Sequence, residues 1–121
     1  MKTPNEIADA YISTWNERDQ TKRNTLIARD WSEGAIYIDP LMQGTGHSEI
    51  ASLIDAVQER FPDFRFSLLS KPDGFGANVR FSWGLGPQDA EPAIKGTDFV
   101  TLENGQLQRV VGFLDQLPAG A

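Results

Sequence analysis

Residues 94–114 are IKGTDFVTLENGQLQRVVGFL, and this stretch decides the fold that we predict for the chain. Apolar and polar residues alternate on both sides of Asn104-Gly105, as expected of two strands that each have one buried face. An Asn-Gly pair between two such runs is the strongest short signal for a β-hairpin. The stretch therefore predicts two antiparallel strands, over residues 94–103 and 107–114.

A carboxyl group interrupts the apolar row of the first of these strands. Asp98 shares one face with apolar or small residues, namely Ile94, Gly96, Val100 and Leu102. Burying an unpaired carboxylate is costly, so Asp98 is expected to be protonated, partnered, or turned towards a cavity that holds water or ligand. Two structural alternatives remain: a bulge changes the face that Asp98 occupies, or Asp98 pairs with Arg109. A two-residue loop would place Arg109 opposite Val100 and diagonal to Asp98.

Upstream of this hairpin, the same period-two pattern predicts two more strands, over residues 64–70 and 78–85. Turn signals separate the strands, at residues 71–74 (Lys-Pro-Asp-Gly) and 86–89 (Gly-Pro-Gln-Asp). The second half of the chain is therefore predicted to form an antiparallel meander.

The first half of the chain is predicted to be mainly helical. Thr3, Pro4 and Glu6 form a helix start with a capping box, and an apolar stripe follows at helical spacing. A shorter helix is expected over residues 20–28, and a longer one from residue 46 to Pro62. A strand is expected between them, at residues 35–39. Helices first and a meander afterwards predict an α+β domain, with helices covering one face of a curved sheet. We expect a single domain over residues 1–115 and a flexible tail over residues 116–121.

Composition excludes several classes of partner. The chain has 121 residues, no cysteine and a formal net charge of −6. Nucleic acids and anionic membranes are bound by basic surfaces, and the 11 Lys and Arg residues are scattered singly. No secretory signal or long apolar run is present, so we expect a cytoplasmic protein that binds neither nucleic acid nor membrane.

Three further residues are candidates for chemistry. Asp39 lies at the end of a predicted strand before Pro40, where it either caps a turn or faces the mouth of what the sheet encloses. Tyr11 lies on the apolar stripe of the first helix and needs a hydrogen-bond partner. His47, the only histidine, lies at a helix start and is either a surface residue or a pocket residue. One histidine and no cysteine leave no metal-ligand set, and no nucleophilic triad motif is found.

The order and spacing of four motifs resemble the SnoaL-like and ketosteroid-isomerase-like proteins of the nuclear transport factor 2-like superfamily. The motifs are Tyr11 to Asp19 (YISTWNERD), Ile38-Asp39-Pro40, Gly46 with Ile50, and Gly96-Thr97-Asp98-Phe99 followed by Asn104-Gly105. This resemblance implies a cone-shaped, strongly curved antiparallel sheet, also called cystatin-like, with helices on its concave face. It also implies a homodimer formed through the outer face of the sheet.

In ketosteroid isomerases the aspartate of the Asp-Pro pair is the base, while a helix tyrosine and a protonated late-strand aspartate stabilise the enolate. The resemblance assigns these roles to Asp39, Tyr11 and Asp98. In the similar polyketide cyclases a late-strand acid is instead the general acid/base, which would be Asp98. A second supporting tyrosine of the isomerases is missing, because Leu53-Ile54 occupies that region.

We therefore expect an enzyme without a cofactor or metal, acting by proton transfer next to a carbonyl group of a small hydrophobic substrate. The expected activity is of the isomerase or cyclase type, or that of a related lyase or hydrolase. The expected catalytic residues are Asp39, Asp98 and Tyr11, and the expected pocket residues are Trp15, Tyr37, His47, Trp83 and Val111. One alternative is a non-catalytic ligand-binding module of the same fold. Another is an interaction dimer with an exposed apolar patch that includes Phe99 and Val110.

Overall fold

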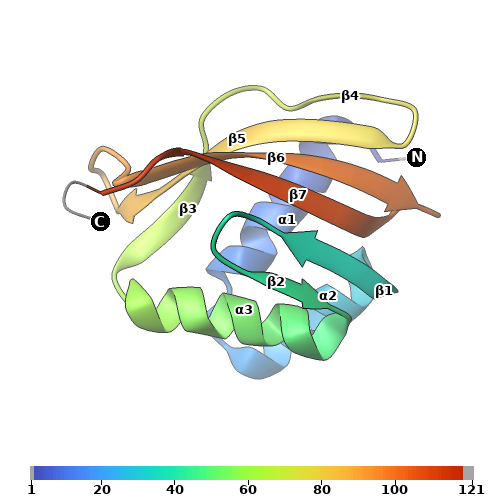
Figure 1. Cartoon of the computed structure of the whole chain (residues 1–121), viewed down its shortest axis with the longest axis horizontal. Helices are drawn as coiled ribbons and strands as arrows, with labels where there is room; N and C mark the ends of the chain where they lie inside the picture. Colours follow the sequence, from blue (N-terminus) through green and yellow to red (C-terminus); the bar gives the residue numbers. More distant parts are fainter. Residues whose placement is uncertain (1, 119–121) are drawn as a thin grey trace.

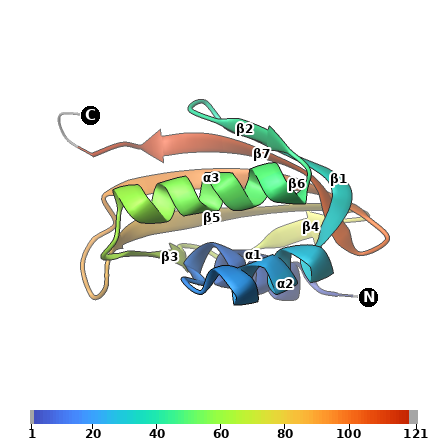
Figure 2. The same ribbon diagram turned by 90° about the horizontal axis from the view of Figure 1, so that it is seen from below.

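Three helices lie on one side of a seven-stranded sheet in the computed structural model, which describes residues 2–118 (Figure 1). The helices are α1 (Pro4–Asn16), α2 (Gln20–Asp30) and α3 (His47–Arg60). Seen from below, α3 passes in front of the long central strands, and α1 and α2 lie beside it (Figure 2). This arrangement confirms the predicted α+β class with helices packed against a curved sheet.

Side-chain caps explain where the first two helices begin. The backbone N–H of Glu6 donates to the Thr3 hydroxyl at 3.1 Å, and the Thr3 N–H donates to the Glu6 carboxylate at 3.0 Å. These two bonds form the predicted capping box of α1. Asp19 likewise accepts a hydrogen bond from the backbone N–H of Lys22, at 2.9 Å, where α2 starts. This second helix runs to Asp30, two residues beyond its predicted end.

The sheet has the strand order β2-β1-β7-β6-β5-β3, and β4 pairs with β5 outside this path. Two of its strands, β2 and β4, were not predicted, because three residues are too few to show a period in the sequence. The strands are β1 (Trp31–Ile38), β2 (Gln43–Thr45), β3 (Phe64–Leu68), β4 (Asp73–Phe75), β5 (Asn78–Pro87), β6 (Ile94–Glu103) and β7 (Gln106–Gln116). Residues 119–121 of the predicted tail lie outside the described residues.

The strand β1 differs from its prediction in extent and in pairing. It begins at Trp31, directly after α2, because the backbone there is already extended, with φ −109° and ψ 137°. It pairs with β7 in parallel, whereas the other strand pairs are antiparallel among the described residues. A parallel pair needs a long connection, and the segment between β1 and β7, which includes α3, provides it. The sheet is therefore mixed.

The hairpin between β6 and β7 has the predicted two-residue turn, with Asn104 and Gly105 at φ 52° and 79°. The first pairs follow the register expected from this turn, Glu103 opposite Gln106 and Leu102 opposite Leu107. Beyond them the register shifts by one residue, so that Arg109 lies opposite Thr101. The expectation that Arg109 faces Val100 is therefore wrong, because a bulge interrupts the ladder.

Aromatic side chains fill the space between the helices and the inner face of the sheet. Tyr11 of α1 lies at their centre, with ring centroids 5.0 Å from Phe81, 5.8 Å from Trp31 and 6.1 Å from Trp15. All four of these residues are buried. Of the helices in the part of the chain that the structure describes, none is long and apolar enough to cross a membrane.

Close contact between Trp83 and Gly96 gives a test of this packing. A Cβ atom on Gly96 would lie 2.3 Å from Cζ2 of Trp83 and 2.8 Å from the carbonyl oxygen of Phe113. Gly96→Ala should therefore lower the free energy of unfolding by about 1–3 kcal/mol, measured by urea titration. Gly34→Ala is the control, because a Cβ atom there meets nothing within 4 Å. Equal stability of the two variants would contradict the packing described above.

Candidate active site

The carboxyl group of Asp98 is buried at the centre of the molecule. Asp98 lies in the middle of β6 on the inner face of the sheet and is 1% exposed. The hydroxyl of Tyr11, on α1, donates a hydrogen bond to its Oδ2 atom at 2.6 Å. The prediction that Asp98 lies in the buried row is confirmed, and its partner is Tyr11 rather than Arg109.

The second oxygen of this carboxyl group, Oδ1, makes no hydrogen bond to any residue between 2 and 118. It lies over Gly112 of β7, which pairs with Asp98 across the two strands. A Cβ atom on Gly112 would lie 2.8 Å from this oxygen, closer than side chains tolerate. Gly112 therefore leaves space for a carboxyl oxygen that is buried but accepts no hydrogen bond from the described residues.

Burial raises the pKa of Asp98 from 3.8 to about 6, because the apolar surroundings disfavour the carboxylate. The hydrogen bond from Tyr11 opposes this shift, and so does the indole of Trp83, which approaches the carboxyl group without making a regular hydrogen bond. The charges of Asp39 and Asp115 raise the pKa further. Asp98 can therefore gain or lose a proton close to neutral pH.

Tyr11 is a permanent donor in this pair. Burial, followed by the charge of Asp98, raises the pKa of Tyr11 well above its ordinary value. The phenol consequently stays protonated at neutral pH.

Asp39 forms a second carboxyl–phenol pair, at the end of β1. The hydroxyl of Tyr37 donates to its Oδ2 atom at 2.6 Å, and the backbone N–H groups of Leu41 and Met42 donate to its Oδ1 atom at 2.8 and 2.9 Å. Asp39 therefore caps the turn that follows β1, one of its two predicted roles. Both oxygens of the Asp39 carboxyl group therefore already have donors within the protein.

The two pairs lie next to each other over β7. A Cβ atom on Gly112 would lie 2.8 Å from Oδ1 of Asp98, 3.3 Å from Cβ of Asp39 and 3.6 Å from the hydroxyl of Tyr37. The pKa of Tyr37 is raised by burial and then by the charges of Asp98 and Asp39. The structure thus brings together Tyr11, Tyr37, Asp39 and Asp98, all of which are candidates from the sequence.

Three buried indoles surround these pairs. The Nε1 atoms of Trp15, Trp31 and Trp83 have no hydrogen-bond partner within the described range, residues 2–118. Trp15 also packs against Tyr37, with ring centroids 5.5 Å apart. A buried donor without a partner costs about 1–3 kcal/mol, so three of them in one core are a feature that needs a cause.

Two predicted pocket residues lie elsewhere. The Nε2 atom of His47 lies 2.8 Å from the carbonyl oxygen of Trp31, and the ring lines a hollow of about 380 Å³ between α2 and α3. Val111 lies opposite Phe99 on the outer face of the sheet and lines a hollow of about 580 Å³ there. The bulge in β7 explains why Val111 lies on the outer face, because without the bulge Val111 would pair with Asp98 on the inner face.

The site residues predicted from the sequence did not include Gly96 and Gly112, which make room for Trp83 and for Asp98. The available signal was a glycine inside a strand pattern, which marks close approach of another group. Among residues 2–118, no group of three or more acidic or histidine side chains is placed to hold a metal ion.

The family of this chain is shown by comparison with solved structures. No family model matches the chain, and no curated protein matches it. A SnoaL-like family protein from Agrobacterium tumefaciens, provisionally named an isomerase, is 45% identical, with a TM-score of 0.86 over 90% of this chain and 94% of that one.

More distant structures share the fold. A protein from Kribbella flavida, provisionally named a ketosteroid isomerase, is 18% identical, with a TM-score of 0.70 over 98% of this chain and 82% of that one. A protein from Sinorhizobium meliloti, provisionally named a polyketide cyclase, is 13% identical, with a TM-score of 0.70 over 88% and 92%. The fold is thus nuclear transport factor 2-like, and this chain belongs to the SnoaL-like family.

Proposed function

We propose that the protein catalyses proton transfer at a carbon atom next to a carbonyl group of a small hydrophobic substrate. The observation that supports this most directly is the buried carboxyl group of Asp98, which has one oxygen held by Tyr11 and the other without a protein donor. A pKa of about 6 suits a group that must both take and return a proton near neutral pH.

In this proposal Asp98 is the general acid/base. The ionised carboxylate takes the proton on Oδ1 while Tyr11 holds Oδ2. The electrons of the broken C–H bond form a C=C bond, and the carbonyl oxygen gains the negative charge. Return of the proton to another carbon atom of the substrate completes an isomerisation and restores Asp98.

Asp39 is a positioning residue in this scheme. Three hydrogen bonds already occupy its carboxyl group, which leaves less capacity for a substrate proton than Asp98 has. Its charge acts on Asp98 instead, by raising the pKa of that group. The assignment of Asp39 as the base, implied by the ketosteroid isomerases, therefore agrees less well with these contacts.

Deuterium exchange tests the proposed reaction class. The protein would be incubated in D₂O with a panel of enolisable ketones and β-keto esters, and label at the α-carbon followed by NMR. Asp98→Asn should slow exchange by about 10²–10⁴-fold, because the proton acceptor is lost. Asp39→Asn should slow it less, since the amide oxygen still caps the turn.

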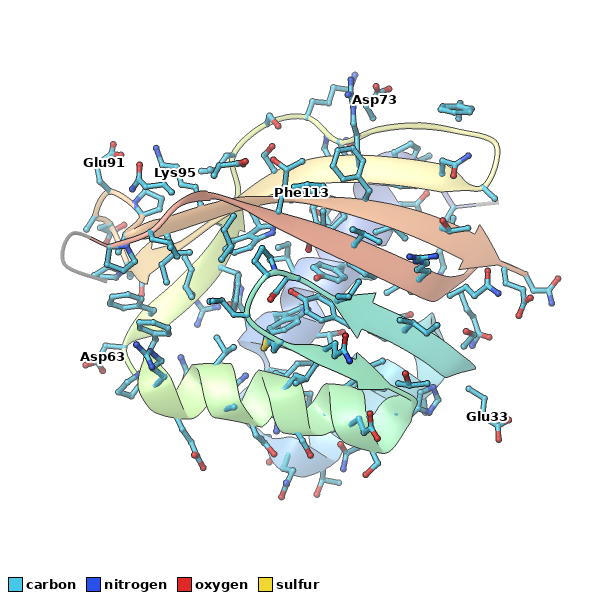
Figure 3. The ribbon with its side chains drawn as sticks, viewed as in Figure 1. Glu33, Asp63, Asp73, Glu91, Lys95 and Phe113 are labelled. Atoms are coloured by element: carbon cyan, nitrogen blue, oxygen red, sulfur yellow. The ribbon has the colours of Figure 1, made fainter. Side chains whose placement is uncertain are left out.

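Asp63→Asn, at an exposed carboxyl group just beyond the C-terminal end of α3 (Figure 3), is the matched control and should exchange at the wild-type rate. Exchange that is unaffected by Asp98→Asn would refute the proposal. Binding without exchange by any member of the panel would favour the non-catalytic module.

Stability should depend on pH through the same group. Between about pH 4 and 6 the folded protein holds a proton on Asp98 that the unfolded chain has released, so this contribution to stability falls as the pH rises. Above about pH 6 the buried Asp98 is ionised in the folded protein. Its burial then lowers the free energy of unfolding by up to about 3 kcal/mol. Asp98→Asn should therefore be more stable than wild type at pH 8 and lose that advantage near pH 4, by urea unfolding. Parallel pH profiles for the two proteins would contradict this.

We propose further that the chain forms a homodimer through the outer face of its sheet. Ile36, Phe99 and Phe113 lie on that face and are 42%, 43% and 55% exposed, and the two phenylalanine rings pack edge to face. Figure 3 shows Phe113 on the side of the sheet away from α3. The expectation that Val110 belongs to this patch is wrong, because the bulge turns it into the core.

Sedimentation equilibrium tests the dimer. Wild-type protein should have the mass of two chains, and Phe99→Lys that of one, because a buried charge would oppose association. Leu41→Lys is the control, at a side chain that is 74% exposed in the turn after β1. A wild-type protein with the mass of one chain would refute the proposed homodimer.

A further inference from the structure

We propose that the hollow between α2 and α3 binds a small, neutral molecule that carries several hydroxyl groups, such as a sugar or a polyol. The volume of the hollow is about 380 Å³, and the two helices lie on the same side of the sheet (Figure 2). Ligand pockets commonly measure about 300–1,000 Å³, so this one suits a small ligand. Among residues 2–118, neither carboxyl–phenol pair lines the hollow, so the proposal is independent of the proposed function.

The helix faces that border the hollow are mostly polar, whereas helices that cover a core usually turn an apolar stripe towards their neighbours. On α2 the lining residues are Gln20, Asn24 and Ile27, which share one face because they lie four and three residues apart. On α3 the first and last lining residues are His47 and Asp55, about 12 Å apart along the helix axis. The seam between the helices therefore presents hydrogen-bonding groups over a length that a sugar of one or two rings would cover.

His47 presents a hydrogen-bond acceptor at one end of the hollow. Its Nε2 atom lies 2.8 Å from the carbonyl oxygen of Trp31. A carbonyl oxygen can only accept, so Nε2 carries the hydrogen of the neutral imidazole, and Nδ1 is left as an acceptor. The contact with the backbone therefore fixes both the orientation and the tautomer of this ring before a ligand binds.

Asp55, at the other end, is held in place by two side chains. Arg23, which is 1% exposed, donates to its Oδ1 atom, and Nε2 of Gln20 donates to its Oδ2 atom at 3.3 Å. The guanidinium of Arg23 is itself fixed by the carbonyl oxygen of Glu17 at 2.9 Å and by Oε1 of Gln58 at 2.8 Å. The pair of Asp55 and Arg23 carries no net charge, and the carboxylate oxygens can accept further hydrogen bonds. This end of the hollow therefore suits the hydroxyl group of a neutral ligand.

Between these ends the lining offers both donors and acceptors. The carboxamide of Asn24 can donate and accept, and so can the hydroxyl groups of Ser48 and Ser52. The hydroxyl of Ser52 donates to the carbonyl oxygen of Ser48 at 3.1 Å, so its oxygen remains available as an acceptor. Ile27, which is buried, adds a small apolar surface that fits the C–H groups of a sugar ring or a polyol.

These groups favour hydroxyl groups over other ligand chemistry. The described residues that line the hollow include no Lys, Arg, Phe, Tyr or Trp, so they lack the usual means of binding an anion or stacking on an aromatic ligand. A cation would meet only the carboxylate of Asp55, whose charge Arg23 already balances. A hydroxyl group both donates and accepts, so it matches the carboxamide, imidazole, hydroxyl and carboxylate groups alike.

NMR of the ¹⁵N-labelled wild-type protein tests the site, with D-glucose, myo-inositol and trehalose as probes at up to about 100 mM. At least one of them should cause saturable shifts of the side-chain amide signals of Gln20 and Asn24. The amide signal of Gln108, which is exposed on β7, should stay where it is. Absence of a saturable shift with all three probes, or equal shifts of Gln108, would overturn this inference.

Matched variants on one helix measure the contribution of the lining. Asn24→Ala removes a carboxamide from the hollow and should weaken binding of the probe by about fivefold. Thr25→Ala is the control, because Thr25 is the next residue of α2, is exposed and does not line the hollow. It should bind within about twofold of wild type, and equal affinities of the two variants would refute the site. Because both changes are at exposed helix positions, both variants are expected to fold.

Discussion

The hydrogen bond from Tyr11 to Asp98 is the interaction on which the rest of the structure depends. It joins the first helix to a central strand across 87 residues of sequence, at 2.6 Å and without contact to solvent. A carboxyl group at this depth is tolerated only with a partner, so it holds α1 against the inner face of the sheet. Gly112 then provides the room that the second carboxyl oxygen needs.

Two carboxyl groups of the same chain have very different surroundings. Asp39, in a turn, accepts three hydrogen bonds, so both of its carboxyl oxygens have donors within the protein. Asp98 is buried, which favours its neutral form, and among residues 2–118 only one of its oxygens has a hydrogen-bond donor. Neighbouring acids with different surroundings can take different roles in catalysis. The formal charge of −6 therefore says little about function, whereas the places of two acids say much.

The helices, the long strands and the burial of Asp98 could be predicted because each depends on local periodicity or on a side-chain cap. Thr3 and Glu6 form their capping box within one helical turn, and the alternation around Asp98 is visible within ten residues. The pairing of β1 with β7 was not predictable in this way, because it depends on how distant segments pack. The places of Val111, Val110 and Arg109 depend on a bulge that no residue type marks.

That bulge has a consequence for how such a site can change during evolution. The residue opposite Asp98 is selected by counting along β7 from the turn, and one extra residue places Gly112 there instead of Val111. Gain of a single codon between the turn and this point, with the bulge kept, would place Val111 opposite Asp98 and close the space over the carboxyl group, and loss of that codon would open it again. Related chains could therefore acquire or abandon chemistry by a change of length, while every residue that contributes chemistry stays the same.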